Sequence, residues 1–168
     1  MQIADFIAID LFAGGGGLTV GLKRAGFEVV SAVELEENAF ATYVVNHPEV
    51  NSLRQDIRSV HAEDLLRTGS EGQADLLVGC PPCQGFSSLT RKYRRGDPRN
   101  ELVAEMGRLV EEIRPRAIMM ENVPGLAERG KPLLDEFIKK LSSLGYLVER
   151  DILQVADFGI PQNRRRLV

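Results

Sequence analysis

Short apolar runs alternate with amphipathic segments along most of this chain. Mostly apolar runs, typical of buried strands, occur at 7–12, 27–33, 51–54, 76–78 and 117–120, and a sixth strand is expected over 146–155. Apolar residues at helical spacing lie between them, at 18–25, 36–46, 100–113 and 132–144, and Ser59 is expected to cap a short helix. This alternation predicts an α/β fold in which a mostly parallel sheet carries helices on both faces.

The size and composition of the chain are those of an ordinary globular domain. Its 168 residues predict a single domain spanning 1–168. No membrane span or signal peptide is recognised, and two cysteines suit a reducing cytoplasm, so we expect a cytoplasmic protein without a membrane partner. The net charge of −3 argues weakly against nucleic acid. Basic residues nevertheless cluster at 91–95 and 164–166, and they form either an edge that binds a polyanion or a solvated surface.

A diproline turn follows the strand predicted at 76–78. In the run Gly79-Cys80-Pro81-Pro82-Cys83, the prolines restrict the backbone at the carboxyl end of a strand, where α/β sheets bind ligands. We expect Cys80 to be buried, which leaves Cys83 as the candidate nucleophile. A redox pair or half of a zinc site is the alternative, but His47 and His61 lack ligand spacing and are expected at the surface or as helix caps. No metal site is predicted.

Four consecutive glycines at 14–17 follow the first predicted strand. Their spacing matches neither the dinucleotide fingerprint nor the phosphate-binding P-loop. Glu34 ends the second strand about twenty residues later, where an acid can accept hydrogen bonds from ribose hydroxyls. Asp56, after the third strand, is placed to meet a base edge. The pattern favours an adenosine that carries no phosphates, such as S-adenosylmethionine, and the alternative is a glycine-rich turn beside a surface glutamate.

Two further groups of residues follow later strands. Glu121 comes directly after the strand at 117–120, so it is expected at the same sheet edge as Cys83, where burial would let it donate a proton. Gln162, Arg164 and Arg166 alternate, and they would share one face if this segment is a strand. Such a face can hydrogen-bond a base or its phosphate.

The motifs occur in an order that resembles one family. The blocks Asp10–Gly17, Pro81–Ser87, Glu121–Val123 and Gln162–Arg166 are similar to the signature blocks of the C5-cytosine DNA methyltransferases, over essentially the whole chain. The resemblance implies a three-layer, Rossmann-like fold and a role in restriction-modification. It also implies methyl transfer from S-adenosylmethionine, leaving S-adenosylhomocysteine, to C5 of a cytosine flipped out of double-stranded DNA. In that mechanism a thiolate bonds covalently to C6.

The resemblance also implies roles for individual residues. The catalytic residues are Cys83 as nucleophile, Glu121 at cytosine N3, Arg166 at cytosine O2 and Arg164 as a positioning group. The implied cofactor-binding residues are Asp10, Phe12, Ala13, Gly14, Gly16, Gly17, Leu18, Glu34, Asp56, Ile57 and Pro82, with Phe12 near the adenine and the Pro82 backbone also near the target base. The implied substrate-binding residues are Gln84, Ser87, Asn122, Val123 and Gln162, and the loop at 84–99 is expected to close over the DNA.

Members of the family continue past the position of Val168 into a region that reads the target sequence and a segment that returns to the catalytic domain. We therefore expect a C-terminally incomplete fold that needs a C-terminal complement, from the same polypeptide or a second subunit. Two other functions stay open. One is an RNA (tRNA) cytosine methyltransferase of the same family, and the other is a catalytically inert module that binds cofactor or nucleic acid. The glycine spacing argues against a third, an NAD-dependent oxidoreductase.

Overall fold

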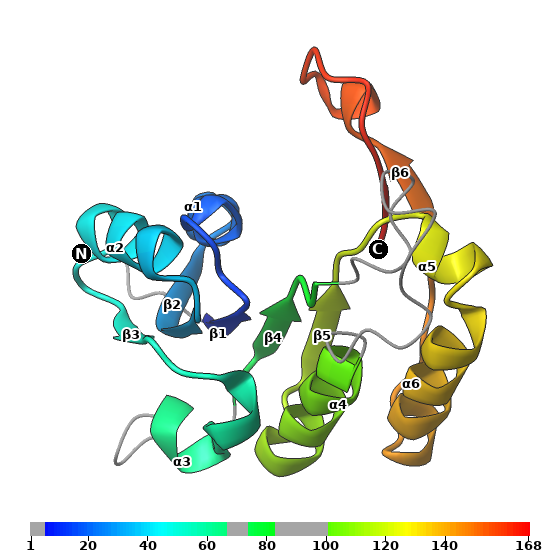
Figure 1. The fold of residues 1–168 in the computed structure, drawn as a ribbon, viewed down its shortest axis with the longest axis horizontal. Helices are drawn as coiled ribbons and strands as arrows, with labels where there is room; N and C mark the ends of the chain where they lie inside the picture. Colours follow the sequence, from blue (N-terminus) through cyan, green and yellow to red (C-terminus); the bar gives the residue numbers. More distant parts are fainter. Residues whose placement is uncertain (1–5, 67–73, 83–100) are drawn as a thin grey trace. The chain divides into compact units, whose positions relative to one another are not determined.

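A computed structural model of the chain describes residues 6–66, 74–82 and 101–168 (Figure 1). These residues fall into two compact units. The first comprises the chain up to Cys80 together with Arg108–Met119, and the second comprises Pro81–Gly107 and Met120–Val168. The single domain expected over 1–168 stays a prediction.

The first unit is built on a five-stranded sheet in the order β3-β2-β1-β4-β5. Its strands are β1 (Phe6–Leu11), β2 (Phe27–Val33), β3 (Asn51–Leu53), β4 (Leu76–Gly79) and β5 (Ala117–Met120). The pairs β1–β2, β1–β4 and β2–β3 are parallel. The strand order reverses between β1 and β4, and ligands of open α/β sheets bind at such a reversal. The predicted α/β class and mostly parallel sheet are confirmed.

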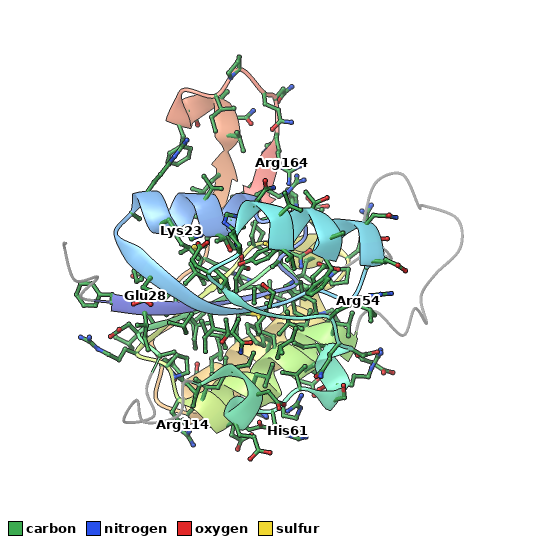
Figure 2. The ribbon with its side chains drawn as sticks, turned by 90° about the vertical axis from the view of Figure 1, so that its left-hand side faces the viewer. Lys23, Glu28, Arg54, His61, Arg114 and Arg164 are labelled. Atoms are coloured by element: carbon green, nitrogen blue, oxygen red, sulfur yellow. The ribbon has the colours of Figure 1, made fainter. Side chains whose placement is uncertain are left out.

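Helices cover both faces of this sheet. The helices α1 (Gly17–Arg24) and α2 (Glu37–Asn46) lie on one side, and the short α3 (Ala62–Leu65) lies on the other (Figure 2). Between the sheet and the first pair, a core forms from Ala8, Leu22, Val29, Ala32, Tyr43 and Val78. On the opposite face, the Ser31 hydroxyl donates to the Leu65 carbonyl at 2.6 Å. The longer α4 (Leu102–Ile113) begins in the second unit and ends in the first.

A β-bulge adjusts β2 to this core. Ala8 pairs with Val29, but Ile9 pairs with Ser31, so Val30 is an extra residue in the ladder. The extra residue lets Val29 and Ala32, three positions apart, pack into the same core. Every residue from Val29 to Val33 is buried, which is why the strand reads as a continuous, mostly apolar run rather than an alternating one.

The second unit carries the helices α5 (Gly125–Glu128) and α6 (Lys131–Ser143) and the antiparallel strands β6 (Ile152–Gln154) and β7 (Arg165–Leu167). A 3₁₀ turn, η5 (Val155–Phe158), follows β6. Leu134, Phe137 and Leu141 recur at helical spacing on α6 and are buried. Asn122 and Leu167 form an antiparallel bridge, which ties the end of β7 to the residues that follow β5.

Three local expectations are wrong. The strand expected over 146–155 is only the three residues of β6, because β7 offers just three partners, and Leu147 is fully exposed. The short helix begins after His61, whose backbone N–H donates to the Asp64 carboxylate at 2.8 Å, whereas Ser59 ends the 3₁₀ turn η1 (Ile57–Ser59). The α5 helix was not expected, and it follows directly from Pro124, whose ring favours helical backbone angles.

No helix among residues 6–66, 74–82 and 101–168 is long and apolar enough to cross a lipid bilayer.

Candidate active site

The glycine-rich turn of the first unit joins β1 to α1 and has an unusual backbone. Phe12, Gly14 and Gly16 have positive φ angles of 58°, 57° and 91°. A left-handed backbone is expected of glycine, but at Phe12 it is strained, and such strain is concentrated at functional sites. A Cβ atom added at Gly14 or Gly17 would meet nothing within 4 Å, so the turn leaves open space at both positions. The expected placement of Phe12 and the glycines beside a ligand stays a prediction.

Glu34 directly follows β2 and contacts this turn. Its Oε2 accepts a hydrogen bond from the Gly14 backbone N–H at 2.8 Å, and its Oε1 accepts one from the Glu36 backbone N–H at 2.7 Å. A carboxylate has about four lone-pair sites, so capacity for two ribose hydroxyls remains. The neighbouring Glu36 caps α2 by accepting from the backbone N–H groups of Asn38 and Ala39. Glu34 is therefore held at the turn by the same segment that begins α2.

Asp56 and Ile57 differ from each other in accessibility. Asp56 caps η1 through the Arg58 backbone N–H at 3.0 Å, and its partly exposed carboxylate also pairs with the Arg58 guanidinium. Ile57 is only 4% exposed, and its expected place beside the cofactor stays a prediction. Its carbonyl and that of Val60 each accept from Arg108 Nη2 at 2.9 Å. Arg108 thus clamps the loop that presents Asp56.

A buried polar network lies among β1, α1 and α2. Thr19 Oγ1 donates to Asp10 Oδ2 at 2.7 Å and lies 2.8 Å from the Tyr43 hydroxyl. Asp10 is fully buried, and within the described residues its Oδ1 has no hydrogen-bond partner. Burial raises the pKa of Asp10 to about 6 against the opposing effect of the Thr19 hydrogen bond, and burial raises the pKa of Tyr43 to about 12. The Asp10 side chain is engaged with Thr19 inside the first unit, and its expected part in cofactor binding stays a prediction.

The Glu34 carboxylate occupies the backbone N–H of Gly14, a donor that a phosphate group at this turn would use. An adenosine that carries no phosphates stays the expectation for this turn. Ala13 is buried, and its N–H donates to the Val33 carbonyl at 3.0 Å, while Leu18 is half-buried. Both are positioned to shape the turn from the protein side.

The second unit brings three of the four expected catalytic residues together. Glu121 directly follows β5, and its Oε1 lies 2.6 Å from Arg166 Nε and 3.4 Å from Arg164 Nη2. Arg166 belongs to β7, and Arg164 lies just before that strand (Figure 2). All three side chains are partly exposed, so a ligand can reach them. Cys83, Gln84, Ser87 and the loop at 84–99 lie outside the described residues.

The two arginines meet Glu121 by a route other than the strand face that was expected. β7 begins only at Arg165, and Gln162 is exposed and precedes it. A bend before β7 is instead held by Gln154 of β6, whose Oε1 accepts from the Arg164 backbone N–H at 3.0 Å. Its Nε2 donates to Asn163 Oδ1 at 2.8 Å. The bend and the strand together direct Arg164 and Arg166 to one carboxylate.

Asn122 connects the diproline turn to β7. Its buried side chain donates from Nδ2 to the Pro81 carbonyl at 2.9 Å, and its Oδ1 accepts from the Val123 backbone N–H at 2.8 Å. Its backbone exchanges two hydrogen bonds of 2.9 Å with Leu167. These bonds let Asn122 join the diproline turn to β7, and its expected contact with substrate stays a prediction. Pro82 and Val123 are half-buried beside it in sequence.

Cys80 was expected to be buried, but it is half-buried. Several residues that support the site carry no signal in the sequence. The functional partners that sequence reasoning missed are Thr19, Tyr43, His47 and Arg108, each of which bonds a segment distant in the chain. The described residues contain no group of three or more His, Cys, Asp or Glu side chains that would hold a metal ion.

Comparison with known proteins gives a consistent result. A family model described as C-5 cytosine-specific DNA methylase matches residues 6–168. The chain is 39% identical over 163 residues to the Type II methyltransferase M1.HphI of Haemophilus parahaemolyticus, with 95% of this chain and 44% of the relative covered. It is 39% identical over 167 residues to M.XorII of Xanthomonas oryzae, covering 96% and 39%. It is 35% identical over 170 residues to M.AquIA of a Picosynechococcus species, covering 95% and 68%.

Solved structures show the same fold. A DNA modification methyltransferase encoded within an E. coli prophage matches with a TM-score of 0.81 and 32% identity, covering 97% of this chain and 45% of that one. The Dnmt2 methyltransferase of S. pombe matches with a TM-score of 0.75 and 25% identity, covering 96% and 48%. The chain thus spans less than half of these two structures and of the first two relatives.

Proposed function

Because this chain belongs to the C-5 cytosine-specific DNA methylase family, we propose that it transfers a methyl group from S-adenosylmethionine to C5 of cytosine in double-stranded DNA. The observation that carries this proposal is the convergence of Arg164 and Arg166 on Glu121. A carboxylate flanked by guanidinium groups offers both acceptors and donors to the edge of a pyrimidine ring. The names of the relatives, all Type II methyltransferases, support DNA as the substrate and restriction-modification as the setting.

The cofactor would be held by the first unit. Glu34 would accept from the ribose hydroxyls, Phe12 would lie against the adenine, and Asp56 would meet the base edge. The Gly14–Gly17 turn would let the backbone approach the ligand closely, since Gly14 and Gly17 have open space at the Cβ position. S-adenosylmethionine supplies an electrophilic methyl group when bound. Its product, S-adenosylhomocysteine, would leave from the same turn.

The chemistry would begin at Cys83. Its thiolate would add to C6 of a cytosine flipped out of the duplex, while Glu121 stabilises or protonates N3, so that the electron pair of the C5–C6 bond becomes available at C5. C5 would accept the methyl group. A base would then remove the C5 proton, and the bond between C6 and the Cys83 sulfur would break. Arg166 would contact the cytosine O2, and Arg164 would position the catalytic residues. Gln84, Ser87, Val123 and Gln162 would contribute contacts to DNA.

A C-terminal complement is part of the proposal. The relatives extend well beyond the matched region, since this chain covers 44% of M1.HphI and 39% of M.XorII. Phe158 and Ile160 are large apolar residues exposed in the second unit, and a complementary segment would bury them. A location in the bacterial cytoplasm, where the DNA lies, follows from the same proposal.

Covalent trapping tests this function. The protein is mixed with S-adenosylmethionine and DNA containing 5-fluorocytosine, and is then analysed on a denaturing gel. A base cannot remove the C5 fluorine as it removes a proton, so the covalent adduct persists. We expect a shifted band that disappears in Cys83→Ser. The matched control is Cys80→Ser, which changes the neighbouring thiol and should keep the band.

The arms of the experiment separate the remaining possibilities. A band formed with 5-fluorocytosine in tRNA but not in DNA would show that the substrate is RNA and not DNA. A folded protein that binds S-adenosylmethionine but forms no adduct, with or without an added C-terminal segment from a relative, would contradict a catalytic role.

A further inference from the structure

His47 is a helix cap whose ring is buried against the glycine-rich turn. It is the C-cap of α2, one of the two places expected for it, but it is only 4% exposed and so does not lie at the surface. Its ring packs against the Tyr43 ring with centroids 4.8 Å apart. A buried imidazole needs hydrogen-bond partners, and both of its nitrogens have one.

One partner is the glycine-rich turn itself. His47 Nε2 lies 3.2 Å from the Gly16 carbonyl oxygen. The contact is close enough to exclude any side chain at position 16, because an added Cβ atom would approach the His47 ring closer than 3.0 Å and Tyr43 Cδ2 to 3.2 Å. The ring therefore fills the space behind Gly16, where φ is +91°.

The other partner determines which nitrogen carries the proton. His47 Nδ1 lies 2.9 Å from Lys23 Nζ, and an ammonium group can only donate. Nδ1 must therefore accept, and the proton of the neutral ring lies on Nε2, where it is donated to the Gly16 carbonyl. Lys23 also pairs with Glu49, and this hydrogen bond lowers the pKa of the Glu49 carboxyl below its ordinary value. The chain Glu49–Lys23–His47 thus ends on the turn.

We propose that His47 is a positioning residue that sets the affinity for S-adenosylmethionine by holding the Gly14–Gly17 turn in its ligand-ready shape. This inference rests on the proposed use of the turn for that cofactor. The Gly16 carbonyl also accepts from the Val20 backbone N–H at 3.0 Å, where α1 begins, so the His47 ring adds a second, buried donor to the same oxygen. A carbonyl held from two sides keeps the turn preorganised, and less ordering is needed when the ligand binds. In this role His47 acts through the Gly16 backbone and not on the ligand itself.

Two conservative substitutions separate the contacts of His47. Glutamine places an amide N–H at the distance of Nε2 and can still donate to Gly16, whereas asparagine reaches only as far as Nδ1. We expect His47→Asn to weaken S-adenosylmethionine binding about five- to tenfold in isothermal titration, as loss of one buried hydrogen bond implies. His47→Gln should stay within about twofold of the unsubstituted protein.

The matched control is His61→Asn. His61 is the other histidine, it also caps a helix, and it lies on the opposite side of the sheet from Lys23 (Figure 2). Its substitution should leave cofactor affinity unchanged. Equal affinities for the His47→Asn and His47→Gln variants, with both proteins folded by urea titration, would overturn the inference. If the unsubstituted protein itself does not bind the cofactor, the proposed function fails instead.

A measurement that does not depend on a His47 variant complements these. In ¹⁵N-detected NMR of the unsubstituted protein, the His47 ring proton should reside on Nε2, and a proton on Nδ1 would contradict the network. Should His47→Asn not fold, Lys23→Met removes the donor from a partly exposed side chain. Without this donor the His47 Nδ1 atom no longer has to accept, so the ring proton can lie on either nitrogen. The affinity for S-adenosylmethionine should then fall about two- to threefold. An unchanged affinity in that variant would also refute the positioning role.

Discussion

Lowering the pH from 7 to 5 should stabilise this protein through Asp10. Burial raises the pKa of Asp10 from 3.8 to about 6, since the carboxylate is taken out of water with one oxygen unpartnered. In this range the folded state binds more protons at Asp10 than the unfolded state does, so the free energy of unfolding rises as the pH falls. The full difference is about 3 kcal/mol, reached below pH 4, and about 1.3 kcal/mol of it develops between pH 7 and pH 5.

The assay is urea unfolding at a series of pH values, for the unsubstituted protein and for Asp10→Asn. Asparagine keeps the shape and can still accept from Thr19, but it does not titrate. Subtracting the two curves removes the opposite contribution of other carboxyls, such as Asp75 and Glu112, whose pKa values hydrogen bonds to the backbone and to arginine lower. The subtraction should leave the Asp10 contribution alone. Parallel curves for the two proteins between pH 7 and pH 5 would refute the reasoning.

Three further predictions concern single contacts. The Phe12→Gly variant should be more stable than Phe12→Ala by about 1 kcal/mol in urea unfolding, because only glycine adopts a φ of 58° without strain. Both variants should lose cofactor affinity. The reverse order of stability would contradict a strained turn. The Asn122→Ala substitution should lower the free energy of unfolding by about 1–3 kcal/mol, since the Pro81 carbonyl loses its donor. The exposed control is Asn163→Ala. An equal or smaller loss of stability in Asn122→Ala than in this control would count against the role of Asn122 in holding the diproline turn. Arg166→Lys should reduce the yield of trapped adduct roughly a hundredfold, because lysine lacks the Nε that meets Glu121, whereas Arg165→Lys, on the neighbouring exposed residue, should leave it unchanged.

The strands and helices of the first unit were predictable because each has a strong local signal. β2 spans Phe27–Val33 and β5 spans Ala117–Met120, as expected from their apolar runs. Glycine and proline mark the ends of several elements, so boundaries such as the start of α6 differ from expectation by one residue. The strand predicted at 146–155 was too long, because the length of β6 depends on a partner strand more than ten residues away. No local sequence pattern indicates how long that partner is.

The site was predictable to the extent that its residues follow strands. Glu34 and Glu121 could be found because each directly follows a strand. The alternation of Arg164 and Arg166 drew attention to both, but a bend before β7, and not a shared strand face, brings them to Glu121. The supporting residues could not be found in this way. His47 and Asn122 look like ordinary polar residues in the sequence, and their roles depend on atoms 31 and 41 positions away, at the Gly16 and Pro81 carbonyls. Such pairings are set by tertiary packing, which a single sequence does not display.

The hydrogen bonds of Asn122 have a consequence for folding kinetics. Contacts that close a large loop form slowly, and Asn122 meets Pro81 across 41 positions, while Glu121 meets Arg164 across 43. The ion pairs at Glu121 and the bridge between Asn122 and β7, which is three residues long, close loops of similar length, and Arg166 lies on β7 itself, so we expect them to form together. Undocking that strand releases Arg166 and the Asn122 backbone in one event. Hydrogen exchange at the Leu167 N–H would thus report how often Arg166 leaves Glu121.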